Sequence, residues 1–89
     1  MLRVSVISPE RVLFEGEARL VVAPAHDGEV GILTQHAPMV TLLGSGLLRL
    51  EGGNGGEQRF HVEGGFLQVA DNEVRVVTER ASADTGALR

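Results

Sequence analysis

The chain contains no cysteine, lysine, tryptophan or tyrosine, and each absence excludes a kind of chemistry. Without cysteine it can form no disulfide, no thiolate nucleophile and no zinc site with cysteine ligands. Without lysine it has no residue for a Schiff base or for the phosphate contact of a P-loop. Its aromatic residues are three phenylalanines, so we expect a core of Val, Leu and Ile.

Basic charge and long apolar runs are also scarce. Twelve acidic residues against eight arginines give a formal net charge of −4. Because phosphate backbones bind to basic surfaces, we expect no nucleic acid partner. No apolar run approaches the roughly 18–20 residues of a membrane span, and the opening MLRVSVISPE alternates instead of forming a signal-peptide core. We therefore expect a soluble, intracellular domain with no direct membrane insertion.

What the chain does have is a period of two, interrupted by twelve glycines. Leu2, Val4 and Val6 alternate with Arg3 and Ser5, as in a strand with one buried face. At 89 residues the chain is one domain. The pattern predicts an all-β fold of about nine to ten strands without a helical hairpin at the C-terminus. Two antiparallel sheets would pack as a sandwich or flattened barrel.

Turn signals divide the predicted strands. Arg11–Pro24 predicts two strands with a break near Gly16, and the GGNGG stretch at residues 52–56 predicts the tip of a hairpin. A further hairpin is predicted around Asp71–Asn72. We expect a sandwich domain over residues 1–80 and a loose tail over residues 81–89, because the tail lacks periodicity and large apolar residues.

A double glycine precedes one of the phenylalanines. Gly64 and Gly65 permit positive φ or a close approach of two backbones, which favours a corner of the sheet. We expect Phe66 to point into the core there. In the preceding strand, Phe60 and Val62 should point inward and His61 outward.

The stretch DGEVGILTQHAP, residues 27–38, is the strongest candidate for a reaction centre. Asp27, Glu29 and His36 have the side chains of a metal or acid–base site. A metal site needs three or four converging ligands, however, and His26 and His61 belong to other parts of the pattern. A solvated turn is a second interpretation, and a loop that contacts a partner is the one we favour.

Two other motifs are incomplete. Ser45 in LGSGL lacks the G-x-S-x-G elbow of a serine nucleophile. The GGNGG stretch is followed by a strand and has no G-K-[S/T], so it is not a phosphate loop. The residues alone therefore indicate an acidic β-sandwich with no catalytic set, no metal site and no cofactor, acting as an interaction module.

Two longer stretches add a resemblance. GEVGILTQHAPMVTLLGSGLLRL and HVEGGFLQVADNEVRVVTE resemble the N-terminal β-sandwich domain of the F-type ATP synthase epsilon subunits, called delta in mitochondria. The family pattern is G-E-x-G-I-x-x-x-H-A-P, then G-x-[L/I]-R, then G-G-F/I-x-x-V and N-x-V-x-V. The match extends over residues 2–80 in order. The matching residues are Gly28, Glu29, Gly31, Ile32, His36, Ala37, Pro38, Gly46, Leu48, Arg49, Gly64, Gly65, Phe66, Val69, Asn72, Val74 and Val76.

The resemblance implies a non-catalytic subunit in the central stalk of the ATP synthase complex, on the cytoplasmic face of the membrane. Such a subunit binds gamma and rests on the polar loops of the c-ring, so that proton-driven ring rotation turns gamma and drives ATP synthesis. By this resemblance Glu29 faces the c-ring, whose polar loop is basic in the family. The residues it places toward gamma are Ser8, His36 and Thr41. A rigid apolar loop contact is implied for Ala37, Pro38 and Met39.

The chain departs from the family pattern in two places. Most family members continue into a C-terminal helical hairpin that regulates ATP hydrolysis, and ADTGALR at residues 83–89 matches its nucleotide motif poorly. We therefore expect no inhibitory arm and no nucleotide site within these residues. Residues 34–36 read TQH, where many relatives have Pro-Gly before the histidine. One alternative to a rotor subunit is a small β-sandwich enzyme or ligand-binding domain, with Asp27, Glu29 and His36 as its working residues. A second is a β-sandwich interaction module of another lineage, which shares the fold and differs in its partner.

Overall fold

The computed structural model describes residues 1–53 and 56–83, and this part of the chain contains ten strands and no helix. The strands are β1 (Leu2–Ile7), β2 (Val12–Ala18), β3 (Leu20–Ala25), β4 (Gly28–Ile32), β5 (Met39–Leu42), β6 (Ser45–Glu51), β7 (Gln58–Glu63), β8 (Phe66–Ala70), β9 (Glu73–Val77) and β10 (Arg80–Ala83). The predicted all-β fold of nine to ten strands is confirmed.

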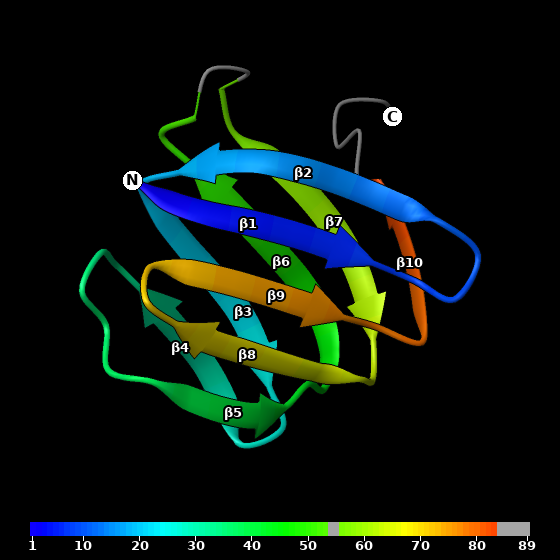
Figure 1. Cartoon of the computed structure of the whole chain (residues 1–89). Helices are drawn as coiled ribbons and strands as arrows, with labels where there is room; N and C mark the ends of the chain where they lie inside the picture. The colour runs from blue at the N-terminus through cyan, green and yellow to red at the C-terminus, as the bar shows by residue number, and fades with distance from the viewer. Residues whose placement is uncertain (54–55, 84–89) are drawn as a thin grey trace.

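The strands form two five-stranded sheets that pack face to face (Figure 1). Sheet 1 has the order β2-β1-β9-β8-β5, and sheet 2 has the order β10-β7-β6-β3-β4. The predicted two-sheet sandwich is therefore confirmed. One pairing differs from the expectation of purely antiparallel sheets, because β1 and β9 run parallel in the middle of sheet 1. Two strands so distant in sequence need the intervening chain as their connection, and no local turn signal announces such a pair.

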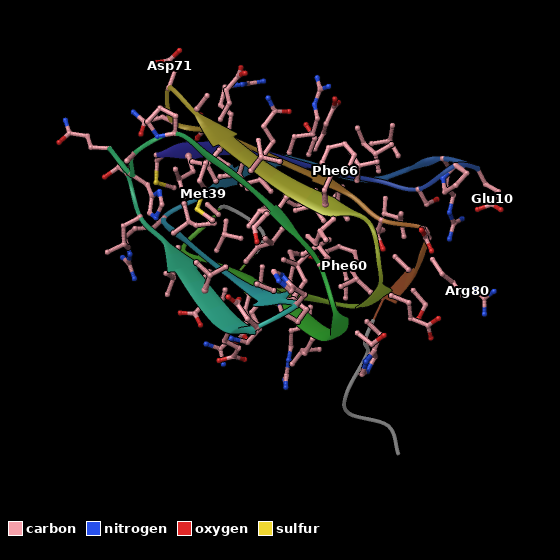
Figure 2. All side chains as sticks on the ribbon, turned by 90° about the horizontal axis from the view of Figure 1, so that it is seen from below. Glu10, Met39, Phe60, Phe66, Asp71 and Arg80 are labelled. Carbon is pink, nitrogen blue, oxygen red and sulfur yellow. The ribbon has the colours of Figure 1, made fainter. Side chains whose placement is uncertain are left out.

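The core lies between the sheets and is almost entirely aliphatic. Its buried members come from eight of the ten strands and from the connection after β5: Leu2, Val4, Val6, Ala18, Val21, Ala23, Ile32, Leu43, Leu48, Leu50, Phe60, Val62, Leu67, Val69, Val74 and Val76. Phe60 is 5% exposed, and its ring centroid lies 6.2 Å from that of the half-buried Phe14. Figure 2 shows Phe60 between the two layers. The predicted inward direction of Phe60 and Val62 is confirmed.

Backbone hydrogen bonds close one side of the sandwich where β5 passes into β6. The His26 N–H donates to the Leu42 carbonyl at 3.0 Å, and the Gly44 N–H donates to the Pro24 carbonyl at 2.8 Å. On its other side the same connection reaches sheet 1, because the Leu43 N–H donates to the Gly65 carbonyl at 2.9 Å. The sandwich is therefore a flattened barrel along this side.

The double glycine forms the corner between β7 in sheet 2 and β8 in sheet 1. Gly64 has φ +68° and Gly65 has φ +100°, a region that side chains rarely adopt. A Cβ atom at Gly65 would also overlap the carbonyl oxygen of Val77. Both properties expected of this pair are present, and they fix how the chain enters β8.

The expected inward direction of Phe66 is wrong. Its side chain is 39% exposed, whereas Leu67 and Val69 are buried. Since alternate residues of a strand face opposite sides, the burial of Leu67 and Val69 puts Phe66 on the outer side of sheet 1. Figure 2 labels Phe66 on that side of β8. Alternation within the strand agrees with this direction, because Phe66 shares a side of β8 with the polar and exposed Gln68.

Two boundaries also differ from the sequence prediction. The break between the second and third strands lies at Arg19 and not near Gly16, because Gly16 pairs with Val4 inside β2. At the other end, β10 pairs with β7 over Arg80–Ala83, and residues 81–83 of this strand belong to the segment expected to be a loose tail. The remaining residues of that tail lie outside the described part of the chain. A segment with such weak periodicity forms a strand only because a neighbouring strand pairs with it.

The two predicted hairpins are present. β6 and β7 pair antiparallel around the GGNGG stretch, of which residues 54–55 lie outside the described ranges. A Cβ atom at Gly53 would overlap the Glu17 carbonyl oxygen, so the hairpin packs closely on β2. β8 and β9 pair around Asp71 and Asn72, whose φ values of +52° and +62° define the turn.

Candidate interaction surfaces

Residues 26–38 connect the free edges of both sheets. His26 and Asp27 form the turn between β3 and β4, and β4 is the edge strand of sheet 2. Residues 33–38 then lead to β5, which is the edge strand of sheet 1. Figure 1 shows β4 and β5 on the same side of the sandwich. The segment therefore presents one rim of each sheet, held by the buried Ile32 between them.

Three hydrogen bonds position the connecting loop. The backbone N–H of Gln35, which has φ +66°, donates to Asn72 Oδ1 at 2.6 Å and so ties the loop to the β8–β9 turn. The His36 N–H donates to the Leu33 carbonyl at 3.2 Å. His36 Nδ1 lies 2.7 Å from the Ala37 carbonyl oxygen. A carbonyl can only accept, so this contact requires the proton on Nδ1 and directs Nε2 away from it.

Asp27, Glu29 and His36 do not form a metal cluster. Within the described ranges, no three His, Asp or Glu side chains lie close enough together to hold a metal ion. Among the described residues, three surface hollows lie over β1, β2, β8, β9 and the β6–β7 turn, and none of these three is lined by Asp27, Glu29 or His36. Asp27 and Glu29 are exposed and His36 is half-buried. The arrangement offers contact groups and no enclosed site.

The residues expected to face gamma lie at separate positions around sheet 1. Ser8 follows β1, is 8% exposed, and its hydroxyl donates to the Arg11 carbonyl at 3.3 Å within the β1–β2 turn. Thr41 is half-buried on the opposite edge strand, β5. His36 lies at the other end of the strands, beside the Asp71 turn. Figure 2 places Glu10, next to the Ser8 turn, and Asp71 at opposite ends of the molecule.

Glu29 lies apart from all three, on the outer side of β4, opposite Pro24 of β3. It is exposed on the edge strand of sheet 2. In the loop, Ala37 and Pro38 are exposed, whereas Met39 packs against the core and is only partly available for contact. The structure thus separates Glu29 from the residues around sheet 1.

Several exposed apolar residues were not expected from the sequence. Val12 is 54% exposed, Val40 69% and Leu42 61%, and with Phe66 they all lie on strands of sheet 1. On β5 the alternation sends Met39 and Thr41 inward and Val40 and Leu42 outward. The only polar residue of PMVTLL is Thr41, and it lies on the inner side, so the sequence pattern favours the opposite direction for this strand.

The outer side of sheet 2 is charged instead. Arg49 Nη2 lies 3.3 Å from Glu51 Oε2, and Arg59 Nε lies 3.8 Å from Glu57 Oε2. At the edge, Arg80 Nη1 lies 3.8 Å from Glu63 Oε1. Such exposed pairs add little stability and keep a surface hydrated.

Fold and surface together define a class of protein: a β-sandwich domain whose described part presents contact surfaces and no reaction centre. Comparison with known families gives the particular one. Residues 1–84 match the beta-sandwich domain of the ATP synthase delta/epsilon chain, and the protein belongs to this family. The predicted family resemblance is confirmed.

Named relatives agree with this assignment. The chain is 43% identical over 76 residues to the ATP synthase epsilon chain of Syntrophomonas wolfei, which covers 85% of this chain and 56% of the relative. It is 46% identical over 88 residues to the epsilon chain of Leptospira borgpetersenii. This alignment covers 99% of this chain and 65% of the relative. The chain thus spans less than two thirds of the length of these relatives.

Solved structures share the fold. A chain of the Euglena gracilis mitochondrial ATP synthase, from a structure of its OSCP, F1 and c-ring, superposes with a TM-score of 0.85 at 23% identity, covering 98% of this chain and 56% of that one. A chain from the central stalk and c-ring of the Tetrahymena thermophila enzyme gives 0.74 at 15% identity, with 99% and 77% covered.

In the residues that the structure describes, no helix is long and apolar enough to cross a membrane.

Proposed function

We propose that this domain is a non-catalytic coupling element of the central stalk of an F-type ATP synthase. It would bind gamma on one surface and the c-ring's polar loops on another, as a peripheral component on the cytoplasmic face of the membrane. The match of residues 1–84 to the delta/epsilon beta-sandwich family supports this assignment most strongly. Proton-driven rotation of the ring would pass to gamma and so to ATP synthesis.

The positions of the contact residues fit two neighbours. Glu29 is exposed on β4, the edge strand of sheet 2. Thr41 and the Ser8 turn lie near the two opposite edges of sheet 1, Thr41 on β5 and Ser8 between β1 and β2. A carboxylate on a free edge can meet a basic polar loop without displacing the contacts around sheet 1. A rim pair of this kind sets register and association rate more than affinity.

The scaffold also suits torque transmission. The two sheets enclose a continuous aliphatic core, and backbone hydrogen bonds join them where β5 leads into β6. A rotor element must keep its two contact surfaces in fixed relation while force acts on them. Densely packed cores have low compressibility, so this fold resists such deformation.

The test compares the binding of charge variants to purified c-ring and to purified gamma. We expect Glu29→Arg to weaken c-ring binding strongly and Glu29→Gln to weaken it less, because the former adds repulsion to a lost attraction. Both effects should shrink at high salt. Gamma binding should not change.

Glu57→Arg is the matched control. Glu57 is also an exposed acid beside sheet 2, but it lies by the β6–β7 turn, at the far end of the strands from Glu29. It should leave c-ring binding unchanged. If the unaltered domain associates with neither gamma nor the c-ring, the proposed function is wrong and the domain is an interaction module of another kind.

A further inference from the structure

Asn72 joins three segments that lie far apart in the sequence. With a φ of +62° it forms part of the turn between β8 and β9. Its backbone carbonyl accepts from the Arg3 N–H at 2.8 Å, in β1. Its side-chain Oδ1 accepts from the Gln35 N–H at 2.6 Å, in the connecting loop of residues 33–38. One residue therefore holds this loop on the end of sheet 1.

Within the described ranges, no other hydrogen bond joins the connecting loop to another segment. The His36 N–H donates to the Leu33 carbonyl at 3.2 Å, but this bond lies inside the loop. The two ends of the loop are anchored by Ile32, which is buried, and by Met39, which packs against the core. Figure 2 shows the chain passing beside the Asp71 turn on its way to Met39. The bond to Asn72 is therefore what fixes the middle of the loop.

The connecting loop continues the edge that carries the proposed c-ring contact. Glu29 lies on β4, and Leu33 follows directly after that strand. The Leu33 side chain is 57% exposed. At about 3.3 Å per residue, Leu33 lies about 13 Å from Glu29, within the span of one ordinary interface. A partner that reaches Glu29 from the edge of sheet 2 thus also meets the start of this loop.

A contact loop binds more weakly when it can leave its binding conformation. Binding must order a mobile segment, and apparent affinity falls with the fraction of molecules in the competent conformation. The held conformation is an uncommon one, because Gln35 has a φ of +66° and a side chain. Without the Asn72 side chain as acceptor, the loop would leave this conformation for part of the time.

We propose that Asn72 is a positioning residue for c-ring binding, because its side chain holds the connecting loop in the conformation that meets the ring. The inference rests on the proposed function above and extends it to a residue that acts through the loop. Since the carbonyl of the same residue binds Arg3 of β1, the loop and sheet 1 are held as one body. A rotor element needs this rigidity between its contact edge and its scaffold.

The experiment measures binding of the 89-residue chain to purified c-ring by titration calorimetry, at low and at high salt. Asn72→Gly keeps the turn, because glycine tolerates positive φ, but removes the acceptor. It should weaken binding about threefold to tenfold. The loss should be similar at both salt concentrations, because the lost bond is not an ion pair. The loss in Glu29→Gln, in contrast, should shrink at high salt.

Two variants of the same turn are the controls. Asn72→Asp retains an oxygen acceptor and a residue type that tolerates positive φ, as Asp71 does beside it at +52°. At high salt, where its added charge is screened, it should bind within about twofold of the unaltered chain. Asp71→Gly loosens the turn backbone and keeps the acceptor, so its affinity should also change less than about twofold.

Hydrogen exchange in the free chain shows whether the loop itself is loosened. The His36 amide donates to Leu33 and not to Asn72, so it reports the loop and not the lost bond. It should exchange faster in Asn72→Gly and at its original rate in both controls. Thermal unfolding of each variant verifies that it is folded.

The outcomes separate this inference from the proposed function. If the unaltered chain binds the c-ring and Asn72→Gly binds equally well, the inference is wrong and the proposed function stands. The inference is also wrong if either control loses as much affinity as Asn72→Gly, or if the His36 amide is unaffected. If the unaltered chain does not bind the c-ring, the proposed c-ring contact is wrong and this inference with it.

Discussion

The outer sides of the two sheets differ, although both sheets pack on the same core. Sheet 1 exposes Val12, Val40, Leu42 and Phe66, whereas the described strands of sheet 2 expose no large apolar residue. Sheet 2 presents paired arginines and glutamates at 3.3–3.8 Å instead. The inner residues of both sheets alternate in the same way, so the outward residues alone make one side apolar and the other charged.

The comparison shows that an apolar residue stabilises this fold only where it is buried between the sheets. An apolar residue between the sheets is removed from water on folding and stabilises the domain. An apolar residue on the outer side of sheet 1 remains accessible to solvent. The side to which a residue points is set at the glycine corner and the turns, and the predictions below test this from the largest expected effect to the smallest.

Gly65→Ala should cause the largest loss of stability. The new Cβ atom would overlap the Val77 carbonyl oxygen at a residue with φ +100°, so both sterics and backbone strain oppose it. We expect the free energy of unfolding in urea to fall by about 4 kcal/mol or more. Gly31→Ala is the control, since its Cβ would meet only Leu20 Cδ1 at 3.9 Å. Equal stability of the two variants would refute the role of Gly65 in entering β8.

Leu67→Ala should separate the inner side of sheet 1 from its outer side. Leu67 is fully buried, so its truncation should cost about 3 kcal/mol in unfolding free energy through lost burial and a cavity. Leu42→Ala, at the opposite side of the neighbouring strand, should cost less than about 1 kcal/mol. Chemical denaturation of both variants measures the difference, and a similar loss in both would show that the outer side of sheet 1 is part of the core.

Asn72→Gly should loosen the loop that joins the rims of the two sheets. Glycine tolerates the φ of +62° but cannot accept from the Gln35 N–H, which now donates to Asn72 Oδ1 at 2.6 Å. We expect a loss of about 1 kcal/mol and faster hydrogen exchange at the Gln35 amide. Asp71→Gly, in the same turn, should leave that amide unchanged. Unaltered exchange in both variants would mean that this bond does not hold the loop.

Glu51→Gln should have the smallest effect. It removes the ion pair with Arg49 on the outer side of sheet 2, where both side chains are about one third exposed and screened by solvent. The unfolding free energy should change by less than about 0.5 kcal/mol, with little dependence on salt. Thermal unfolding at two salt concentrations tests this. A loss comparable to that of Leu67→Ala would make the charged side of sheet 2 a structural element.

The hairpins could be predicted because their signals are local. Asp71 and Asn72 tolerate positive φ, and the glycines at 52–53 allow the close approach to β2. The family motif around Glu29 and His36 was equally readable in sequence. The break at Arg19 and the strand at Arg80–Ala83 were not, because each depends on a partner far along the chain. The outward direction of Phe66 was readable from its alternation with Gln68, but the double glycine before it favoured the core. The contact roles of Ser8, Glu29, His36 and Thr41 stay predictions that binding experiments must test.

By itself the sequence determined the all-β class, the aliphatic core, the local turns and the family. These follow from alternation, composition and residue types that act over a few positions. Only the tertiary structure decided that β1 and β9 pair in parallel and that Val12, Ile7, Val77, Phe66 and Leu42 align in one row. The physical reason is that strand register joins residues distant in sequence, and a shift of one residue would turn each of them to the other side.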